Sequence, residues 1–489
     1  MHQPMIEHLG TENIDIRDIA VDSRAVSPGT LFIAVEGTEK DGHDYIDAAL
    51  QNGAAAVLLN EHANLHPKPE SSVTLIPVPD TKAALRHLAP YFFNHPAKKL
   101  QLIGITGTNG KTTTAYLIDT LLTRAGKKSG LISTIAYRDG KREIKAKNTT
   151  PGLLDLQRTF AEMQKNRITH VVMEVSSHAL HQGRVAGCTF KTAIFTNLTQ
   201  DHLDYHGTMT AYFTEKKTLF EQTQGKWLIN IDDPWGKQLQ QSAPEKVWTY
   251  GIDTPADLSP LHYQSTLDGL SMTASSPAGA IEIRSSLSGR HNVYNILSAI
   301  GAGLLEGLTK EEISEGIAAL ENVPGRFEKI DSGQNFTVIV DYAHTADALE
   351  RLLQALRHLK PNRILTLFGC GGDRDRGKRP KMGQAAATLS DQIILTSDNP
   401  RSEAPRAIIE EIEAGVLSHA KTRGHEVDYE MMTDRREAIH HIIRLAKAGD
   451  AVLIAGKGHE TDQQIGGRTF PFDDREVARQ ALAARQNRA

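Results

Sequence analysis

The chain has 489 residues, too many for one hydrophobic core, and its length predicts about three domains. A hydrophobic fraction of 39%, a charged fraction of 23% and a net charge of −4 are typical of a soluble globular protein and exclude a globally basic surface for nucleic acid. Two cysteines, Cys188 and Cys370, cannot form a disulfide framework. With no export signal and no apolar run long enough to span a bilayer, we expect a cytoplasmic protein.

The first section of the chain, residues 1–97, has the pattern of a small α/β unit. A polar stretch with Pro96 follows it and predicts a hinge at residues 94–99. The predicted strands cover residues 31–35 and 54–59, and the predicted helix covers residues 81–93.

The segment from Gly104 to Thr114 is the most informative one in the chain. It lies between an apolar run and residues at helical spacing, a context in which backbone N–H groups cradle phosphate. Gly104 is one residue too far from Gly110 for the standard Walker spacing, which leaves the tighter pattern Thr106 to Thr112. The alternative is an ordinary glycine-rich turn. Because a lysine and a threonine open the helix, we expect a nucleoside triphosphate, with Lys111 at its terminal phosphates and Thr112 on Mg²⁺.

The middle section, residues 98–330, continues in strand–helix units. Its predicted strands cover residues 170–173 and 192–195, a strand-rich interval covers residues 245–288, and a helix covers residues 293–305. Glu174 ends one strand where a Mg²⁺ ligand would lie, and several nitrogen and oxygen ligands occur between Asn197 and Gly207. Alone, that second segment would be a solvated turn; beside a phosphate loop, a second metal site is favoured.

Lys216 and Lys217 lie in an amphipathic helix predicted at residues 212–220. Their spacing alone favours two solvated lysines.

The last section, residues 331–489, repeats one architecture four times. Each strand runs into charged or glycine residues and then a helix, and ligands bind beyond the carboxyl ends of such parallel strands. The predicted strands cover residues 336–340, 364–368, 392–395 and 451–454.

Charged residues are concentrated after two of these strands. The segment 373–381 is cationic with interleaved carboxylates and no aromatics, which favours a small anionic ligand over nucleic acid. Asp398, Asn399, Pro400 and Arg401 combine a carboxylate, an amide and a guanidinium, a set that suits a zwitterion, although a capping turn is an equal alternative.

Taken together, these motifs resemble the Mur ligase family, which builds the peptide stem of bacterial cell walls. The resemblance implies an α/β fold with three domains: a small nucleotide-sugar domain (1–97), a central P-loop ATPase-type domain with a mostly parallel sheet (98–330), and a Rossmann-like amino-acid domain (331–489). The matching segments, in the family's order, are residues 106–112, 148–152, 174–178, 197–206, 291–295, 325–328 and 341–344.

The resemblance is strongest to members that add meso-diaminopimelate to UDP-N-acetylmuramoyl-L-alanyl-D-glutamate, because residues 398–401 match their signature. It implies an ATP-dependent amide ligase that works through an acyl phosphate in cytoplasmic peptidoglycan synthesis. Lysine lacks the second carboxylate and would leave Arg401 unpaired. The rivals are a lysine-adding relative, a folylpolyglutamate synthetase, against which Asp22 to Arg24 argue, and a P-loop ATPase that ligates nothing.

The same resemblance implies roles for individual residues. Lys111, Glu174, His202 and Lys216 are implied to be catalytic, and Thr112, Glu174, His202 and a CO₂-derived carbamate on Lys216 to hold two Mg²⁺ ions. ATP is implied to contact Gly107, Thr108, Asn109, Gly110, Lys111, Thr112, Thr113, Asn292, Asn295, Arg326, Asp341 and His344. The UDP-muramoyl dipeptide is assigned Val21, Ser23, Asn148, Thr149, Thr150, Ser176, Gln182 and Arg184. Diaminopimelate is assigned Arg374, Asp398, Asn399, Pro400, Arg401, Gly456 and Glu460. We expect a monomer whose partners are small molecules, without nucleic acid or membrane insertion, and whose last domain closes after ATP binds.

Overall fold

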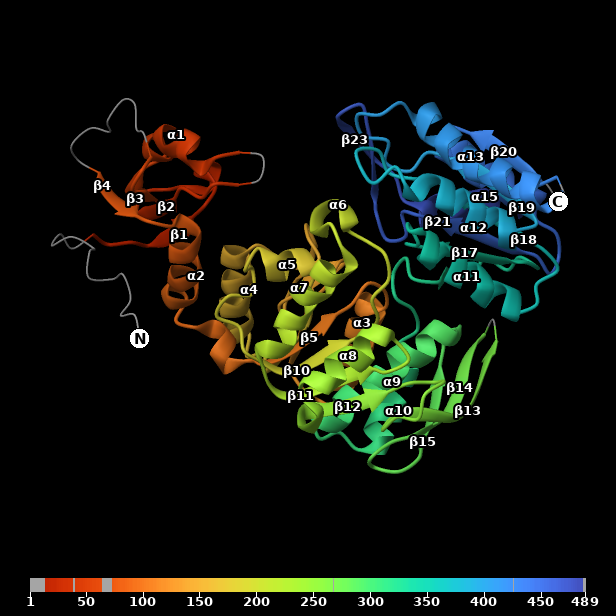
Figure 1. The fold of residues 1–489 in the computed structure, drawn as a ribbon, viewed down its shortest axis with the longest axis horizontal. Helices are drawn as coiled ribbons and strands as arrows, with labels where there is room; N and C mark the ends of the chain where they lie inside the picture. The colour runs from red at the N-terminus through yellow and green to blue at the C-terminus, as the bar shows by residue number, and fades with distance from the viewer. Residues whose placement is uncertain (1–13, 38–39, 64–72, 267, 425, 487–489) are drawn as a thin grey trace.

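The computed structural model describes residues 14–37, 40–63, 73–266, 268–424 and 426–486. Mixed α/β units follow one another along the chain, the N-terminal unit at the left of Figure 1, the central unit below and the C-terminal unit at the upper right. No described helix is long and apolar enough to cross a membrane. The N-terminal residues in which we expect no export signal lie outside the described ranges.

The N-terminal unit is a four-stranded parallel sheet with two α-helices. Its strands are β1 (Asp18–Ala20), β2 (Thr30–Ile33), β3 (Ala54–Asn60) and β4 (Thr74–Val78), in that order across the sheet, and its helices are α1 (Ile46–Gln51) and α2 (Thr81–Phe92). The predicted strands and helix are confirmed. The Asp80 carboxylate accepts the N–H groups of Lys82 and Ala83 and caps α2, which explains where that helix begins.

The central unit is built on an eight-stranded sheet of order β12-β11-β10-β5-β9-β6-β7-β8. All neighbours are parallel except the β6–β7 and β7–β8 pairs. The strands are β5 (Gln101–Thr106), β6 (Ser129–Ile132), β7 (Ala136–Arg138), β8 (Glu143–Lys145), β9 (His170–Glu174), β10 (Phe190–Phe195), β11 (Thr223–Asn230) and β12 (Val247–Tyr250). The mostly parallel central sheet predicted from the sequence is confirmed.

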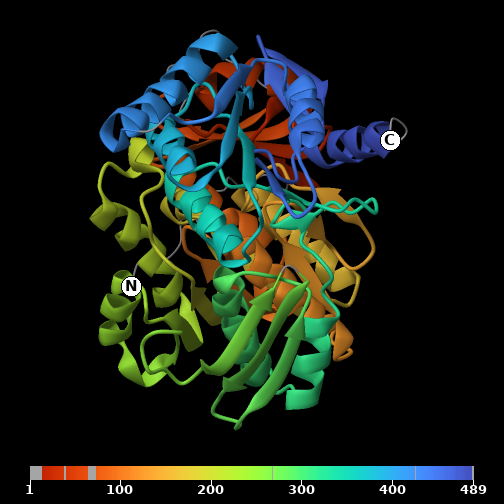
Figure 2. The ribbon, with the colours of Figure 1, turned by 90° about the vertical axis from the view of Figure 1, so that its right-hand side faces the viewer.

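Helices cover both faces of this sheet, so its inner strands, such as β5, β9 and β10, are nearly continuous buried runs. The helices are α3 (Lys111–Arg124), α4 (Leu153–Lys165), α5 (Ser177–His181), α6 (Leu203–His206), α7 (Met209–Glu221), α8 (Pro234–Ser242), α9 (Arg290–Leu305) and α10 (Lys310–Ala318). The strand-rich interval is β12 followed by a separate antiparallel sheet of β13 (Ser259–Thr266), β14 (Gly269–Ser275) and β15 (Ile281–Ser285), which Figure 2 shows at the bottom of the molecule. One core joins α3, α9 and α10 to that small sheet.

The C-terminal unit has a six-stranded sheet of order β16-β17-β21-β18-β19-β20, parallel except at β16. One core packs α11–α13 on one face, and a second packs α14 and α15 on the other, as in doubly wound folds. The strands are β16 (Glu328–Lys329), β17 (Thr337–Asp341), β18 (Ile364–Phe368), β19 (Gln392–Thr396), β20 (Tyr429–Met432) and β21 (Ala451–Ala455). The helices are α11 (Ala346–His358), α12 (Lys378–Leu389), α13 (Pro405–Arg423), α14 (Arg435–Leu445) and α15 (Asp474–Gln486).

The four predicted strands are confirmed as β17, β18, β19 and β21, but the repeat differs in two places. An unpredicted pair, β20 and α14, lies between the third and fourth predicted strands, because β20 is a half-buried edge strand without a continuous apolar run. After β21 the chain forms a hairpin, β22 (Asp462–Ile465) and β23 (Arg468–Pro471), before α15 begins. The domain boundaries at residues 97 and 330 stay a prediction.

Candidate active site

The predicted phosphate loop lies between β5 and α3. Gly107 has a φ of 144°, and a Cβ there would lie 1.9 Å from Thr196 Oγ1, so a side chain at this position would displace the loop. Asn197 supports the turn, because its carbonyl and its Oδ1 accept the N–H groups of Thr108 and Asn109 at 2.8 and 2.9 Å. The loop is therefore preformed at the start of α3, where a helix N-terminus favours an anion.

Two lysines converge on one carbonyl oxygen of this loop. The Nζ atoms of Lys111 and Lys216 each donate to Gly107 O at 2.9 Å, and Lys111 Nζ also donates to Thr108 O at 2.8 Å. Lys216 is buried, with its Nζ 4.5 Å from the centre of the Tyr212 ring. Burial, reinforced by the charge of Lys111, lowers the pKa of Lys216 well below its usual value, and burial also lowers the pKa of Lys111. The interpretation of Lys216 as a solvated lysine is wrong, because its side chain points from α7 toward the phosphate loop and is buried there.

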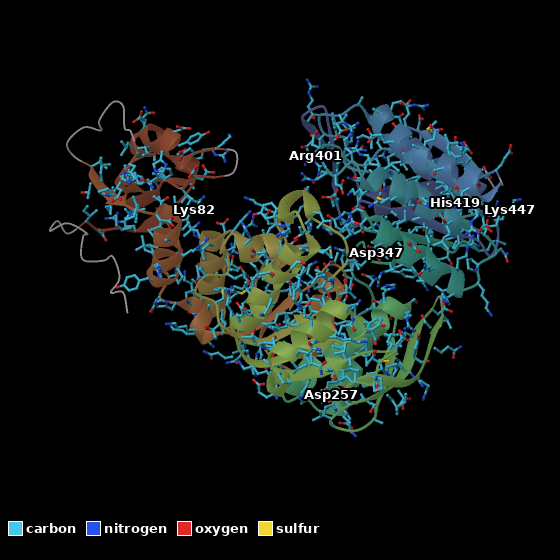
Figure 3. The ribbon with its side chains drawn as sticks, in the orientation of Figure 1. Lys82, Asp257, Asp347, Arg401, His419 and Lys447 are labelled. Atoms are coloured by element: carbon cyan, nitrogen blue, oxygen red, sulfur yellow. The ribbon has the colours of Figure 1, made fainter. Side chains whose placement is uncertain are left out.

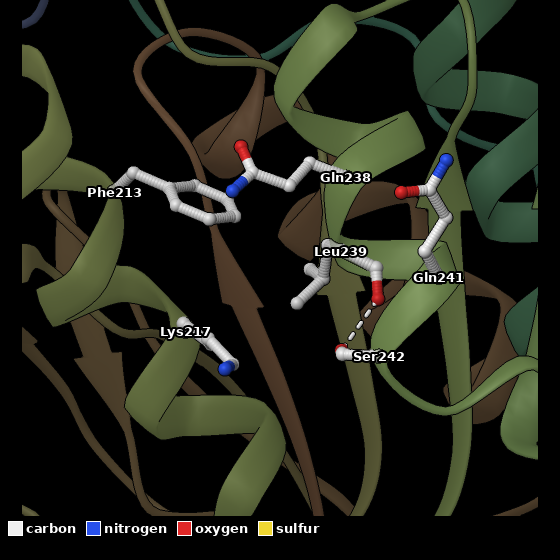
Figure 4. Close-up of a pocket in the computed structure, with 6 residues that line it drawn as sticks. All are labelled: Phe213, Lys217, Gln238, Leu239, Gln241 and Ser242. Atoms are coloured by element: carbon white, nitrogen blue, oxygen red, sulfur yellow. Dashed lines mark hydrogen bonds between the residues drawn. The ribbon is translucent and has the colours of Figure 1, made fainter.

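Lys217 points to a different side of α7. It lines a pocket of about 260 Å³ between α7 and α8 (Figure 4). The residues around that pocket are Phe213, Lys217, Gln238, Leu239, Gln241 and Ser242, and none of them belongs to the predicted site.

Arg326 connects the loop to the C-terminal unit. Its guanidinium donates to Thr112 Oγ1 at 3.3 Å and lies 4.5 Å from the centre of the Tyr342 ring. His344 Nδ1 bonds to Tyr342 O at 2.9 Å, and burial lowers the pKa of His344. The Asp341 carboxylate accepts two backbone N–H groups at 2.6 and 2.7 Å, and its burial raises its pKa. The structure thus gathers Thr112, Arg326, Asp341 and His344 at one junction.

Helix α9 brings the two predicted asparagines to the other side of the loop. A Cβ on Gly110, whose φ is 86°, would lie 2.6 Å from Asn295 Oδ1, so the two residues touch. Asn295 Nδ2 donates to Asn292 Oδ1 at 2.9 Å, and Thr114 Oγ1 donates to Asn295 Oδ1 at 3.3 Å. Thr113 is buried in the first turn of α3.

Glu174 lies at the carboxyl end of β9 and is held by Thr134. Its Oε1 accepts the Thr134 N–H at 2.8 Å and its Oε2 accepts the Thr134 hydroxyl at 3.0 Å, while Thr134 Oγ1 lies 3.1 Å from Thr149 Oγ1. Thr150 Oγ1 donates to Glu174 O at 2.9 Å and accepts the Ser176 N–H at 3.1 Å. A predicted metal ligand and three residues of the predicted dipeptide channel therefore share one hydrogen-bonded group.

Arg184 extends this group toward solvent. It donates to Thr150 O at 2.9 Å and to Gln182 Oε1 at 2.8 Å. Asn148 lies nearby in the chain, and its carbonyl accepts the Tyr137 hydroxyl. From Glu174 to Arg184, the predicted channel residues of the central unit thus form one hydrogen-bonded group, with Asn148 close to it in the chain.

His202 sits in a cluster of rings built by α5, α6 and α7. Its ring is T-shaped against His178 at 4.8 Å between centres, and His178 lies 5.5 Å from His206. Burial lowers the pKa of His178 and of His202 to about 4, although the Asp201 carboxylate, 3.3 Å from His202 Nε2, acts in the opposite direction. These rings are therefore neutral near pH 7, the form in which a histidine ligates a metal.

Val21 and Ser23 follow β1 in the N-terminal unit. Val21 is exposed, whereas Ser23 is buried and its carbonyl accepts Asn52 Nδ2 at 2.9 Å. Between them, Asp22 pairs with Arg24 at 2.7 Å, and that hydrogen bonding lowers the pKa of Asp22 to about 2. The described hydrogen bonds of Ser23 stay within this unit, so the structure does not join it to the phosphate loop.

The predicted amino-acid residues come together from two strand ends of the C-terminal sheet. Asn399, after β19, donates through Nδ2 to Oε2 of Glu460, after β21, at 2.8 Å. A Cβ on Gly456 would lie 2.4 Å from Asp398 Oδ2, so the two loops are in direct contact. Burial, together with the charge of Asp398, raises the pKa of Glu460, while Lys457 lowers it.

Arg401 and Arg374 complete this group. Arg401 has a φ of 53° and donates through NH1 to Gly372 O at 2.6 Å, and a Cβ on Gly372 would lie 1.9 Å from Pro400 O. Burial and the positive charge of Arg374 lower the pKa of Arg401. Figure 3 shows Arg401 at the margin of the C-terminal unit that faces the N-terminal unit.

The rest of the cationic segment at residues 373–381 is largely committed to ion pairs. Arg379 is buried and pairs with Glu403 and Glu411 at 2.8 Å each, and Arg376 also pairs with Glu411. These two guanidiniums therefore fasten α12 to α13 and its preceding loop, and Arg374 stays the predicted binding residue of that segment.

Sequence reasoning assigned no role to three residues that lie inside these clusters. Lys457 is buried between Asn399 and Glu460, Thr134 holds Glu174, and Tyr342 lies under Arg326. Lys457 and Tyr342 stand within charged strand-end motifs and could have been found there. Thr134 follows an apolar strand without any such signal.

Comparisons with known proteins agree with this geometry. Three family models match in order: "Mur ligase family, catalytic domain" at residues 15–93, "Mur ligase middle domain" at residues 105–303, and "Mur ligase, glutamate ligase domain" at residues 325–458. UDP-N-acetylmuramoyl-L-alanyl-D-glutamate–2,6-diaminopimelate ligase of Geobacillus thermodenitrificans is 45% identical over 97% of this chain and 96% of its own. The protein of the same name from Solibacter usitatus is 47% identical over 96% of this chain and 94% of its own.

Solved structures give the same result. One of a UDP-N-acetylmuramoyl-L-alanyl-D-glutamate–2,6-diaminopimelate ligase is 34% identical, with a TM-score of 0.65 over 96% of this chain and 95% of its own. The MurF ligase of Thermotoga maritima in complex with ADP, at 18% identity, shares the fold, with a TM-score of 0.66 over 98% of this chain and 100% of its own. Similarity of this extent over nearly the whole length shows that the chain belongs to the Mur ligase family.

Proposed function

We propose that the protein is an ATP-dependent amide ligase that joins meso-diaminopimelate to the D-glutamyl γ-carboxylate of UDP-N-acetylmuramoyl-L-alanyl-D-glutamate. The observation that carries this proposal is the full-length identity to relatives named for that reaction. The clusters described above support it, because a phosphate loop and a group of two carboxylates and two guanidiniums occur in one chain, with Arg326 and Tyr342 between them.

The chemistry requires activation, because a carboxylate oxygen is a poor leaving group. We infer that the γ-carboxylate attacks the γ-phosphorus of ATP, which breaks the bond to ADP and forms an acyl phosphate. The amine of diaminopimelate, having lost a proton, then attacks the acyl carbon, and phosphate leaves from the tetrahedral intermediate. Much of the rate comes from holding the reactants in line, which is worth effective molarities of about 10⁵–10⁸ M.

The loop residues suit the phosphoryl-transfer step. Lys111 would leave the carbonyls of Gly107 and Thr108 and turn its charge to the terminal phosphates, where it stabilises the transferring group. Asn197 keeps the loop in place during this exchange, because its contacts go to the backbone of Thr108 and Asn109 rather than to Lys111.

Thr112, Glu174, His202 and Lys216 form the proposed magnesium set. Among the described residues, no group of three or more His, Cys, Asp or Glu side chains is arranged to hold a metal ion, so the fit depends on the carboxylate, the neutral ring, the hydroxyl and a modified lysine. Glu174 is held rigidly by Thr134, as a ligand should be. Bound Mg²⁺, as one or two ions, would supply charge stabilisation at phosphate oxygens.

We further propose that Lys216 carries a carbamate. A neutral amine adds CO₂ and releases a proton, and burial lowers the pKa of Lys216 well below its usual value, which favours the neutral amine. The product is an anion beside Lys111, which replaces repulsion by attraction and gives the site two further oxygen atoms. We also propose that ATP contacts the residues that surround the loop, which are Asn292, Asn295, Arg326, Asp341 and His344.

For the amino acid, the proposed contacts are opposite charges. Arg401 and Arg374 would bind a carboxylate, and Asp398 and Glu460 would bind an ammonium group. Val21 and Ser23 would contact the uridine nucleotide. The hydrogen-bonded group from Glu174 to Arg184 would bind the muramoyl dipeptide. We infer three domains, 1–97, 98–330 and 331–489, a monomeric state and a place in the cytoplasm.

Phosphate release tests the proposal. The purified protein, ATP, Mg²⁺ and UDP-muramoyl dipeptide are incubated with meso-diaminopimelate, L-lysine or L-ornithine, and product mass is checked in parallel. We expect release that needs both cosubstrates and is at least about 100-fold faster with diaminopimelate, because lysine leaves a guanidinium unpaired. Equal rates with lysine would indicate the lysine-adding activity, and ATP turnover without amino acid would indicate an ATPase that ligates nothing.

A further inference from the structure

Lys457 is a buried lysine at the centre of the amino-acid cluster. It lies between Gly456 and Gly458, which have positive φ values of 116° and 53°, and this backbone turns its side chain inward. Its side chain is fully buried, and its Nζ donates to Asn399 Oδ1 and to Glu460 Oε2, each at 3.0 Å. A buried ammonium with two such partners fixes the position of both.

The contact decides how the Asn399 amide is oriented. Its Oδ1 accepts both Lys457 Nζ and the Gln464 N–H at 3.0 Å, and its Nδ2 donates to Glu460 Oε2 at 2.8 Å. A flipped amide would place its NH₂ group against two donors, which is unfavourable. Lys457 and Asn399 therefore both bind Oε2 of Glu460, and Oε1 accepts no hydrogen bond among the described residues.

The rest of the cluster shows where that free oxygen is useful. The Asp398 carboxylate lies close enough to Gly456 to exclude a Cβ there, so two carboxylates flank the loop that carries Lys457. Without the lysine, burial and the charge of Asp398 would raise the pKa of Glu460 further. The Lys457 charge acts in the opposite direction, which favours a Glu460 carboxylate that can accept a substrate ammonium.

We propose that Lys457 is a positioning residue for the amino-acid substrate, which holds Asn399 in one orientation and fixes the Glu460 carboxylate through Oε2, so that Oε1 is left for the incoming ammonium group. This inference rests on the proposed ligase function and adds a residue to it. Lys457 itself need not touch the substrate, because both of its described contacts are to residues of the site.

The test is Lys457→Met, which keeps the length and apolar stem and removes the charge. We expect the KM for diaminopimelate to rise about 10- to 100-fold, the range for lost charge-assisted hydrogen bonds, with the KM for ATP unchanged within about twofold. The matched control is Lys447→Met, an exposed lysine of the same unit that Figure 3 shows on the far side from Arg401; all its constants should match the parent.

A pH series separates positioning from simple support of the fold. Losing the Lys457 charge raises the pKa of Glu460, so the ratio of variant to parent KM should grow as the pH is lowered from about 8.5 to about 6.5. A structural role would give a constant ratio. The charged or titratable groups that face Glu460 are Lys457, Asp398, Arg401, Arg435 and Tyr342, and only the first is changed.

Every outcome decides the question. An unchanged KM for the amino acid, or a pH-independent ratio, overturns the inference while the parent remains active. If Lys457→Met does not fold, Lys457→Gln provides the same comparison, and loss of the fold in both variants assigns the residue to stability and overturns the proposal. If the parent itself ligates no diaminopimelate, the failure belongs to the proposed function and not to Lys457.

Discussion

Two ammonium groups that donate to the same buried carbonyl oxygen repel each other. Lys111 and Lys216 each place Nζ 2.9 Å from Gly107 O. Two unit charges at about 5 Å repel each other by about 3 kcal/mol at an effective dielectric constant of 20. Burial and the charge of Lys111 lower the pKa of Lys216 well below its usual value, and a buried neutral amine beside a cation can add CO₂ to become an anion. This pair is the physical reason to expect a carbamate at Lys216.

Replacing Lys216 by alanine therefore should remove ligation altogether, with turnover at least about 1,000-fold lower. Excess bicarbonate should give no rescue, because no amine remains to react. Lys217→Ala is the matched control, since it changes the neighbouring residue that faces the pocket of Figure 4, and it should ligate at nearly the parent rate. Phosphate release measures both, and ¹³C NMR of the parent in ¹³CO₂ should show a carbamate signal absent from Lys216→Ala. Near-parent turnover of Lys216→Ala would refute the role.

At the scale of elements, α5 and the segment that leads into α6 place two buried histidines, His178 and His202, next to each other. Burial lowers the pKa of His178 and of His202 from 6.5 to about 4. Between these values the unfolded chain binds protons that the folded chain does not, so the free energy of unfolding must fall as the pH falls from 6.5 towards 4. The short helix α6, which contains no buried residue, is the element that this change should loosen first.

We expect His178→Gln to reduce that acid-side loss of stability, because one of the buried histidines that bind a proton on unfolding is gone. Urea unfolding at several pH values, followed by tryptophan fluorescence, measures it; the three tryptophans, Trp227, Trp235 and Trp248, all lie in the central unit. His358→Gln changes an exposed histidine at the end of α11 and should leave the slope as in the parent. A slope unaltered by His178→Gln would show that the rings are protonated without unfolding.

The strands were predictable where burial on both faces gives a continuous run of apolar residues. Strands such as 364–368 and 451–454 are buried on both faces, so they appear as apolar runs and were predicted correctly. Strand β20 was missed, because an edge strand of four half-buried residues leaves no such run. Motif residues such as Asp398 and Asn399 were found because they follow strands, whereas Thr134 was not, since its importance comes from Glu174, forty positions away in the chain.

At the scale of the whole molecule, the central and C-terminal units meet at a few polar contacts. Arg326 reaches Thr112, Asn109 Nδ2 donates to Asp347 Oδ2 at 3.3 Å, and Lys145 pairs with Asp462 at 2.8 Å. The Lys145 pair is partly exposed, and such pairs contribute roughly 0–1 kcal/mol. Figure 3 shows Asp347 at the margin of the C-terminal unit nearest the central one. Lys329 and Asp268 also pair between the units, at 3.6 Å. Polar contacts of this kind permit relative motion, and two of those named involve the phosphate loop or the start of α3.

A nucleotide in the loop should therefore strengthen the contact between these two units, and Arg326 should transmit most of the effect. For Arg326→Ala we expect affinity for a non-hydrolysable ATP analogue to fall about 10-fold or more, because a charge-assisted hydrogen bond is lost. Small-angle X-ray scattering should show the parent becoming more compact with Mg²⁺ and the analogue, and the variant changing little. Arg479→Ala, which removes a half-exposed arginine on α15, is the control and should behave as the parent. Equal compaction of Arg326→Ala at saturating nucleotide would mean that the loop acts on the C-terminal unit through Asn109 and Asp347 instead.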